Sequence, residues 1–404
     1  MALMNANTLI IGARDTVAYH QAIQLPDDVR ALLFQANRDI RACLRAVSQR
    51  IFDSGRSMSY ASSEYRRTRQ EPLRFELRFL RQGSLVYGTA IDPAQKPPQK
   101  SDLDDGVYAR TEFLSNLDPG LASTRYFELV EAALEPLCRQ RGWRLVTNKD
   151  TCIRIVIAEN AYIDLPLYAV PDSEFVTFEK SIQDATGLRL ALASTQLNSI
   201  LDRFSDVRIP ADRVMLAHRK KGWIPSDPRA LHDWFEQESG RFGPQLKRAS
   251  RYLKGWRDFL FEYHGPSSIA LMACAVRCYK EGGWVPQNDR DDLALLEIAK
   301  RLPGFFRGRI ANPVLSDGEP LNQWDDVERQ RYITAANDLH DHLNSALEGT
   351  MNPEVTVRRL QQAFGDRVPF RPDLVRVVGQ SPARAPAAVA VASPLPLRRP
   401  TTSA

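Results

Sequence analysis

The stretch "RQGSLVYGTAIDPAQKPPQKSDLDDGVYAR", residues 81–110, joins a small-residue turn to a run of acidic residues. Just before it, apolar and polar residues alternate along 74–82 (RFELRFLRQ), which predicts a strand that runs into Gly83 and Ser84. Residues 102–110 have strand character and no helical period, so a second strand is predicted there. The Pro/Lys-rich DPAQKPPQK between the two strands is predicted to be an expendable loop that connects two edges of one site.

The acidic run is informative because of its spacing. Asp102 and Asp104 are two residues apart, so on a strand both carboxylates point to the same face, with Cα atoms roughly 6.6–6.8 Å apart. Such a pair can converge on one or two divalent cations. Leu103 and Asp105 belong to the other face, where Leu103 is expected in the core and Asp105 in a structural or solvent-facing role. A D-x-D pattern is also common in solvated loops, and that alternative stays open at this point.

A third carboxylate favours the metal-site interpretation. Asp164 lies between Ile163 and Leu165 in the apolar strand AYIDLPLYAV, where an ionised carboxylate is costly to bury unless it is paired. A backbone without side chains at Gly83 lets amides approach a phosphate, and Ser84 adds a hydroxyl, although an ordinary β-turn is the simpler alternative. The turn is neither a Walker loop nor GxGxxG. Together these features predict a two-metal phosphoryl-transfer site that prefers Mg²⁺.

The periodicity of the remaining chain predicts strands followed by helices. A long amphipathic helix is expected over 28–53, ending at Gly55, and another over 123–141 with Ser123 as its cap. Residues 143–170 contain two or three strands. Further helices are predicted at 244–264, 266–282, 290–302 and 324–349. This order indicates an α/β or α+β unit with a helical partner domain rather than a repeating βαβ barrel.

Composition limits the classes of function. The 404 residues are 43% hydrophobic and 25% charged, as in an average soluble protein, with a formal net charge of +5. Three of those charges are arginines of the last twenty-one residues, so the body is close to neutral and unlike an obligate nucleic-acid binder. The basic cluster HRKKGW (218–223) is interpreted as a solvated surface turn or, alternatively, a phosphate contact. The longest apolar run is too short to span a bilayer, so no membrane association is expected.

The five cysteines are odd in number and scattered, which indicates reduced thiols in a cytoplasmic protein. Cys274 and Cys278 share a predicted helix face but have no neighbouring His or Cys, so they are expected in the core rather than at a zinc ion. The Pro/Ala-rich end, residues 381–404, is predicted to be a disordered tail.

A Gly-Ser turn after a strand, a downstream D-x-D and a later aspartate resemble the polymerase-β-type nucleotidyltransferases. The longer forms QGSLVYGT, DLDDGVY and YIDLPLYAVP are similar to the bacterial CD-NTases, the DncV-like relatives of animal cyclic GMP-AMP synthase. GWIPSDPRALHDWF (222–235), RYLKGWRD (251–258) and PSSIALM (266–272) extend the likeness into the helical half. The resemblance implies an α+β nucleotidyltransferase core with a helical C-terminal domain and an active site in the cleft between them. The expected division is an N-terminal segment with a long spine helix over 1–60, the core over 61–175, the helical domain over 176–376 and the tail over 377–404.

The resemblance also implies roles for single residues. Asp102, Asp104 and Asp164 would bind two Mg²⁺ ions, for which Mn²⁺ can substitute, and Asp164 would aid deprotonation of the attacking ribose hydroxyl. The expected contacts to nucleotide are Gln82, Gly83, Ser84, Arg154, Lys254 and Ser268. For Lys254 a solvated helix face, for Ser268 a helix cap, and for Arg154 a surface ion pair are the alternatives from the residues alone.

The activity implied by the resemblance is synthesis of a cyclic dinucleotide, cyclic GMP-AMP or a similar purine product, from ATP and GTP or other nucleoside triphosphates, as a second messenger of anti-phage defence (CBASS). A downstream effector is then implied, and also conjugating enzymes like ubiquitin E1 and E2 that act on the C-terminal tail, for which an inert end is the alternative. No insertion like the zinc-binding thumb of the animal enzyme is seen, so direct DNA sensing is not expected. A cyclic trinucleotide product, transfer of nucleotides to an RNA or protein acceptor, and an inactive nucleotide- or RNA-binding scaffold are the alternative functions.

Overall fold

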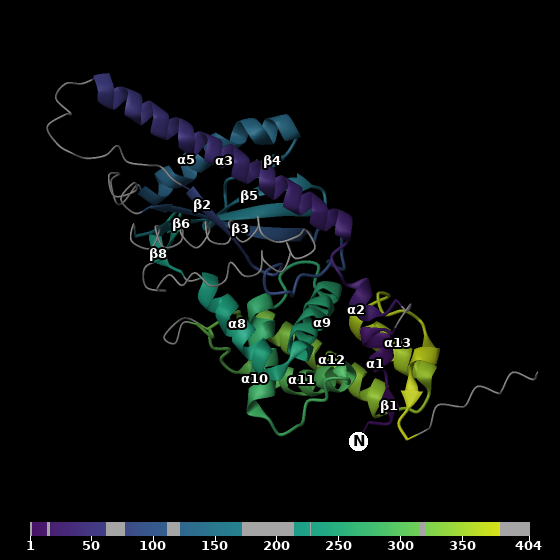
Figure 1. Ribbon diagram of the computed structural model, residues 1–404. Coiled ribbons are helices and arrows are strands. Elements are labelled where there is room, and N and C mark those ends of the chain that lie inside the picture. The colour runs from purple at the N-terminus through teal and green to yellow at the C-terminus, as the bar shows by residue number, and fades with distance from the viewer. Residues whose placement is uncertain are drawn as a thin grey trace, which may run out of the picture.

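A computed structural model of the chain describes residues 2–13, 17–61, 77–110, 122–171, 214–226, 228–314 and 320–379. A mixed β-sheet lies between two long helices on one side and a helical part on the other (Figure 1). This arrangement is the predicted α+β class, with the helical part following the sheet in sequence. No helix within the described ranges combines the length and the apolar composition needed to cross a membrane.

Within the described residues, seven strands form the main sheet. Their bounds are Leu77–Gln82 (β2), Ser101–Arg110 (β3), Arg144–Val146 (β4), Cys152–Ala158 (β5), Ala161–Val170 (β6), Met215–His218 (β7) and Gly222–Pro225 (β8). The order is β2-β3-β6-β5-β4, and β7 pairs with both β6 and β8. The β3 and β6 strands run parallel, while the neighbouring pairs β2/β3 and β5/β6 are antiparallel. The strands predicted within 102–110 and 143–170 are therefore present, and β7 and β8 add to the sheet from a region in which mainly helices were expected.

One face of the sheet is covered by the helices α3 (Asp27–Ala61) and α5 (Ala122–Arg141) (Figure 1). Their apolar stripes pack with the alternate, inward residues of the strands to form one hydrophobic core. The expected end of the first helix at Gly55 is wrong, because α3 continues to Ala61. A glycine inside a helix costs only about 1 kcal/mol relative to alanine, which does not stop a long helix. Ser123 is also not the cap that was expected, since α5 begins at Ala122 and Ser123 is buried inside it.

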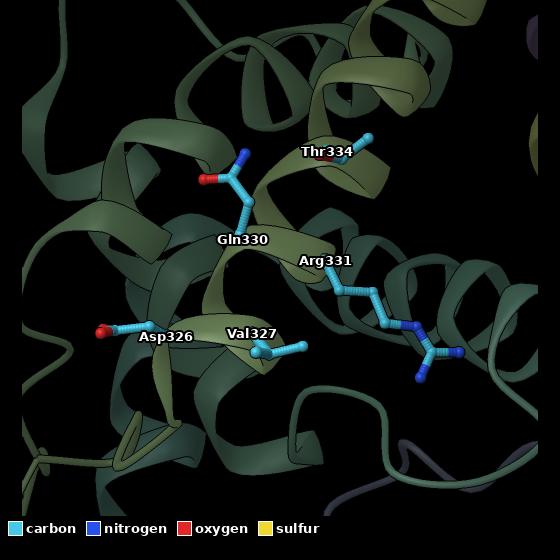
Figure 2. A pocket seen from close by; sticks show the side chains of 5 residues that line it. All are labelled: Asp326, Val327, Gln330, Arg331 and Thr334. Carbon is cyan, nitrogen blue, oxygen red and sulfur yellow. The ribbon is translucent and has the colours of Figure 1, made fainter.

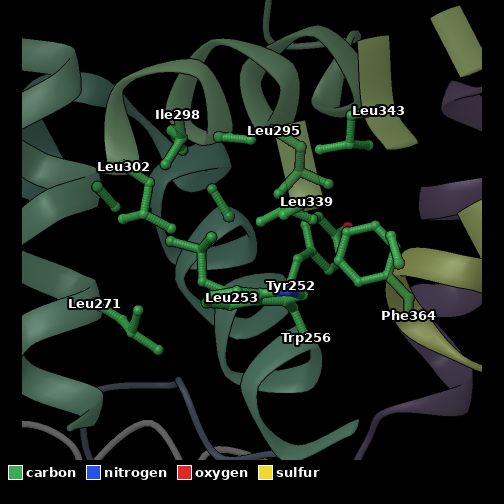
Figure 3. Close-up of a cluster of buried hydrophobic side chains, with 14 of the residues drawn as sticks. Tyr252, Leu253, Trp256, Leu271, Leu295, Ile298, Leu302, Leu339, Leu343 and Phe364 are labelled. Atoms are coloured by element: carbon green, nitrogen blue, oxygen red, sulfur yellow. The ribbon is translucent and has the colours of Figure 1, made fainter. Parts of the chain in front are cut away.

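The helical part forms a second core. Its helices are α8 (Pro228–Phe242), α9 (Pro244–Leu260), α10 (Ser268–Glu281), α11 (Asp291–Arg307), α12 (Asp326–Leu347) and α13 (Pro353–Phe364). Tyr252, Leu253 and Trp256 of α9 lie in the middle of this core, where α10, α11, α12 and α13 meet them (Figure 3). Cys274 and Cys278 are buried in the same cluster, which agrees with their interpretation as core residues.

The beginning of the chain packs with the helical part rather than with the sheet. Strand β1 (Met4–Asn5) pairs with β9 (Arg376–Val377), which follows the short 3₁₀ helix Pro372–Leu374. The small helices α1 (Asn7–Ile11) and α2 (Tyr19–Ala22) place apolar residues in the helical core. The domain boundaries given above stay predictions. The predicted tail, 381–404, lies outside the described residues.

Candidate active site

Four predicted site residues form one row across the sheet. In the strand register Gln82 of β2 lies opposite Asp104 of β3, Asp104 opposite Asp164 of β6, and Asp164 opposite Arg154 of β5. Residues paired in this way point to the same face of a sheet. Asp102 lies two residues before Asp104 on β3 and therefore points to the same face. It is the face not covered by α3 and α5, so the sheet presents three carboxylates and one guanidinium toward the helical part.

Asp105 points the other way, as its position predicted. Its carboxylate is completely buried and accepts hydrogen bonds from Nδ2 of Asn37 at 2.7 Å and from Nε of Arg41 at 2.6 Å, both on α3. A second guanidinium nitrogen of Arg41 completes the ion pair. Asp105 therefore has the structural role of the two considered: it fastens the spine helix to the strand that carries the acidic pair.

The Gly83–Ser84 turn is shaped by the carboxylate of Asp104. Gly83 has φ +77°, a left-handed conformation that favours glycine. A Cβ atom at this position would lie 2.0 Å from Oδ2 of Asp104, which is far inside van der Waals contact. The turn is closed by hydrogen bonds from the amides of Val86 and Tyr87 to the Gly83 carbonyl, each 3.1 Å long. Glycine is thus required both by the backbone and by the acidic group that the turn touches.

The acidic pair is strained electrostatically. Burial and the neighbouring Asp102 raise the pKa of Asp104 to about 8, and burial raises the pKa of Asp102, with Asp164 adding to the shift. Both carboxylates therefore lack sufficient positive charge around them. A hard divalent cation such as Mg²⁺ prefers carboxylate oxygens and would supply that charge, so the donor set fits a metal ion of this kind. Within the described residues, however, no group of three or more His, Cys, Asp or Glu side chains is already arranged to hold a metal ion.

The Asp164 carboxylate is bonded to Arg154 and does not converge with Asp102 and Asp104 on a common metal position. Both of its oxygens accept hydrogen bonds from Arg154, from Nε at 2.8 Å and from Nη2 at 2.8 Å. The guanidinium is held on its other side by the ring of Tyr162, whose centroid lies 3.7 Å from Cζ. The ion pair that was one alternative for Arg154 therefore exists, and it lies on the carboxylate face rather than on the outer surface.

Lys254 approaches the turn from the helical part. It is buried on α9, and its Nζ donates a hydrogen bond of 2.9 Å to the carbonyl of Thr89, at the end of the Gly-Ser turn. Burial and the nearby Arg257 guanidinium lower the pKa of Lys254 to about 8, while Asp102 acts in the opposite direction. A solvated helix face, the alternative for this lysine, is wrong. The Lys254 ammonium lies near Asp102 and Asp104 and partly compensates their negative charge.

Ser268 is not a helix cap, contrary to the alternative considered for it. It is the first residue of α10, whose cap is Ser267, and the Ser267 hydroxyl accepts from the amide of Ala270. The Ser268 hydroxyl instead accepts a hydrogen bond of 2.9 Å from Nη1 of Arg257 on α9. Arg257 had no signal in the sequence beyond its place three residues after Lys254 in RYLKGWRD.

Two basic side chains of the turn 218–223, Arg219 and Lys220, form ion pairs with acidic residues. Arg219 pairs with Glu131 and lies over the ring of Phe127, and Lys220 pairs with Asp150 at 3.1 Å. These contacts favour the surface-turn interpretation, since both cations already have acidic partners within the sheet part.

A hollow on the surface of α12 is separate from the candidate site. It is lined by Asp326, Val327, Gln330, Arg331 and Thr334, which all belong to that one helix (Figure 2). None of these residues is in the row across the sheet or in contact with the Gly-Ser turn. We therefore assign the chemistry to the carboxylate face and not to this hollow.

Comparison with known proteins agrees with this geometry. Residues 77–168 match the family model "Cyclic GMP-AMP synthase DncV-like, nucleotidyltransferase domain", and residues 243–376 match "Cyclic GMP-AMP synthase, C-terminal domain". The cyclic GMP-AMP synthase of Vibrio cholerae is 32% identical over 310 residues, which cover 74% of this chain and 70% of that protein. The chain belongs to the DncV-like nucleotidyltransferase family.

Two further comparisons support the assignment to the DncV-like family. A cyclic GMP-AMP synthase of Escherichia coli is 31% identical over 323 residues, covering 78% of this chain and 73% of that protein. The crystal structure of Vibrio cholerae DncV in complex with the linear intermediate pppA(3′,5′)pG superimposes with a TM-score of 0.75 at 25% identity, over 94% of this chain and all of the other. The family and the fold predicted from the sequence are confirmed, and family membership implies use of a divalent metal.

The pKa shifts predict an unusual pH dependence for this DncV-like protein when metal is chelated. The folded state binds the Asp104 proton more tightly than the unfolded chain does, with a pKa of about 8 instead of 3.8. Stability without metal should therefore fall as the pH rises from about 4 to about 8. In EDTA, we expect the melting temperature to drop by roughly 3 °C or more between pH 6 and pH 8.5, and the drop to be much smaller in Asp104→Asn. Equal drops in the two proteins would contradict the assignment of the shift.

Other residues of this DncV-like site were not predicted from the sequence. Tyr162 supports Arg154, Arg257 reaches Ser268, and the carbonyl of Thr89 receives Lys254. Tyr162 had a usable signal, because it lies two residues before Asp164 on the same strand and so on the same face. The contact of Lys254 with Thr89 joins residues 165 positions apart, and Arg257 and Ser268 lie on two successive helices, so no spacing rule within one element connects either pair.

Proposed function

We propose that this chain joins ATP and GTP into cyclic GMP-AMP in two successive nucleotidyl transfers. Each step forms a bond between a ribose hydroxyl oxygen of one nucleotide and the α-phosphorus of the other, and it breaks the bond from that phosphorus to pyrophosphate. The main support is the row of Asp104, Asp164 and Arg154 with Asp102 beside it, on the sheet face that Lys254 approaches. Cyclic GMP-AMP synthases that are 32% and 31% identical over most of the chain support the choice of product.

The acidic residues are proposed to hold the metal. Asp102 and Asp104 would be the direct ligands and Asp164 the third, with two Mg²⁺ ions as the expected number and Mn²⁺ as a substitute. When bound, such ions lower the pKa of an attacking hydroxyl and neutralise the pyrophosphate leaving group. Arg154 holds the Asp164 carboxylate in place through two hydrogen bonds, and this carboxylate would accept the hydroxyl proton as the new bond forms.

The remaining site residues are proposed to bind the triphosphate. Gly83 and Ser84 would offer a backbone without steric hindrance and a hydroxyl, with Gln82 beside them. Lys254 supplies a point charge, and a phosphate near its Nζ would raise its lowered pKa back toward the charged state. Ser268 would add a hydroxyl from the start of α10, where free amides also favour an anion.

The test is product analysis with purified protein. The protein is incubated with labelled ATP, GTP, CTP and UTP and Mg²⁺ or Mn²⁺, then treated with phosphatase, and the surviving material is separated and identified by mass spectrometry. We expect a phosphatase-resistant cyclic GMP-AMP that requires both ATP and GTP. A resistant trinucleotide would change the product assignment, labelled RNA or protein would indicate an acceptor-dependent enzyme, and nucleotide binding without turnover in cells or in vitro would indicate a scaffold.

A cyclic dinucleotide acts only through a protein that senses it. We therefore propose a separate effector and a role in anti-phage defence within the cytoplasm, and conjugation of the C-terminal tail as a second layer of control. Removing the last few residues should abolish conjugation in cells while the purified protein keeps its rate of synthesis. Conjugation that persists without those residues would defeat the tail hypothesis.

A further inference from the structure

The loop between the Gly-Ser turn and Asp102 is bonded to the helix that carries Lys254. The carboxyl end of a helix leaves its last carbonyls without partners, and α9 ends at Leu260. The side-chain amide of Gln95 donates to the carbonyls of Asp258 at 3.2 Å and Phe259 at 2.8 Å. The amide of Gln99 donates to Asp258 at 2.8 Å and to Phe261 at 2.8 Å. The expectation that DPAQKPPQK is expendable is therefore wrong, because this loop caps α9.

The two glutamines also hold each other in place. The backbone amide of Gln99 donates to the carbonyl of Gln95 at 2.9 Å, and the backbone amide of Gln95 donates to Oε1 of Gln99 at 2.9 Å. A primary amide has two N–H donors and one carbonyl acceptor, so Gln99 uses every hydrogen-bonding group of its side chain. Its N–H groups face the negative end of the helix dipole, which favours this orientation. The capping amides are thus fixed in direction as well as in position.

Two further residues connect the same loop to the helical part. One guanidinium nitrogen of Arg367 donates to the carbonyl of Asp92 at 2.7 Å, and the other donates to the carbonyl of Gly255 at 3.1 Å. The amide of Asp92 donates to the carbonyl of Ile23 at 2.9 Å. The loop is therefore bonded directly to the carboxyl end of α9 and is linked through Arg367 to Gly255, the residue that follows Lys254.

The loop connects two parts of the candidate site along the chain, the Gly83–Ser84 turn and the strand that carries Asp102 and Asp104. Its amino end follows the Gly83–Ser84 turn, and its carboxyl end enters β3 immediately before Asp102. The hydrogen bonds of its middle fix α9 relative to those two ends. A movement of α9 away from the sheet would have to break the caps of Gln95 and Gln99.

We propose that Gln95 and Gln99 are positioning residues, which set the distance between Lys254 and the Gly-Ser turn and thereby the affinity for the nucleoside triphosphate. This inference rests on the proposed function for the nucleotide, but the cap itself is independent of it. The residue type is specific, because a glutamate of the same size has no donor for a carbonyl and places negative charge at the negative end of α9.

The test uses the double variant Gln95→Glu/Gln99→Glu with Gln361→Glu as the matched control. Gln361 also donates from its amide to a backbone carbonyl, that of Val368 at 2.9 Å, but both partners belong to the helical part. We expect the double variant to raise KM for ATP and GTP by at least about tenfold with kcat changed less than about threefold, because a misplaced binding group weakens nucleotide binding. The control removes one such bond instead of four, so it should lose less thermal stability, and it should leave KM unchanged.

Hydrogen exchange of the protein without nucleotide gives a second measurement. Amides of residues 89–99 and of the last turn of α9 should exchange at least about tenfold faster in the double variant and at the wild-type rate in the control. Gln95→Lys/Gln99→Lys keeps hydrogen-bond donors at the carboxyl end of α9 and adds positive charge there, so it should give a KM within about threefold of the wild-type value.

An unchanged KM, or a KM raised equally in the control, would overturn the positioning role. Unchanged exchange in the double variant would overturn the cap. Failure of the proposed function has a different signature: the wild-type protein would not bind nucleotide at all, while its exchange pattern would still respond to the glutamate variants.

Discussion

Asp104→Asn is expected to lower the rate of cyclic dinucleotide formation by at least about 10³-fold, because a lost metal ligand removes several kcal/mol of transition-state stabilisation and each 1.4 kcal/mol is a factor of ten. The same substitution should leave the metal-free protein folded, since it removes a charge whose raised pKa shows that the fold does not compensate it. Activity is measured as labelled product that survives phosphatase, and folding as the melting temperature in EDTA. Asp102→Asn should behave in the same way.

The neighbouring residue provides the control for this prediction. Asp105→Asn breaks a buried ion pair with Arg41, which typically costs about 3–5 kcal/mol of folding free energy. We expect lower stability in denaturant unfolding, while the protein that remains folded keeps most of its specific activity. If Asp104→Asn retained more than a tenth of the wild-type activity, or if Asp105→Asn were the inactive but stable variant, the assignment of the two faces would be incorrect.

Gly83→Ala has the second-largest expected effect. The new methyl group would lie 2.0 Å from Oδ2 of Asp104, so the carboxylate or the turn has to move away from its place. The positive φ of the residue adds about 1–2 kcal/mol of backbone strain. We expect a loss of at least about 10²-fold in kcat/KM, because a displacement of about 1 Å at a reacting centre can cost that factor. Steady-state kinetics with ATP and GTP measure it.

Gly88→Ala separates the two causes. Gly88 lies in the same turn with φ +69°, but a Cβ atom there would meet only Cδ of Lys247, at 3.9 Å. This variant therefore carries the backbone strain without the contact with a carboxylate. This variant should be less stable than the wild-type protein, but its kcat/KM should fall by less than about tenfold. Equal kinetic losses in the two alanine variants would mean that strain, and not the displaced carboxylate, decides the effect.

Local patterns predicted the sheet face of the site well. The period of two along a strand separated Asp102 and Asp104 from Asp105, and the structure places them on opposite faces. A charged residue in an apolar strand singled out Asp164, and the strand register brings it opposite Asp104. Both inferences rest on geometry that the backbone repeats every two residues, so they needed no knowledge of distant parts of the chain. The metal-binding and nucleotide-binding roles of these residues stay predictions.

The errors come from contacts between distant segments. The loop 92–100 was judged by its Pro and Lys content, but the amides that cap α9 are more than 150 residues away from their acceptors. For Arg154 the sequence allowed two interpretations, a nucleotide contact or a surface ion pair. Only the pairing of β5 with β6 shows that its partner is Asp164. The end of α3 was misplaced because a single glycine was taken as a helix end, although its cost inside a helix is only about 1 kcal/mol.

The alternation in β3 has a consequence for the tolerance of the gene to insertions and deletions. Losing or gaining one residue upstream of Asp102 within the strand would exchange Asp104 and Asp105 between faces, so Arg41 would lose its buried partner and the row across the sheet would lose its central acid. Function and folding would then fail in one event. A protein with one residue lost or gained here would therefore fail to fold, instead of forming a stable enzyme with misplaced active-site residues.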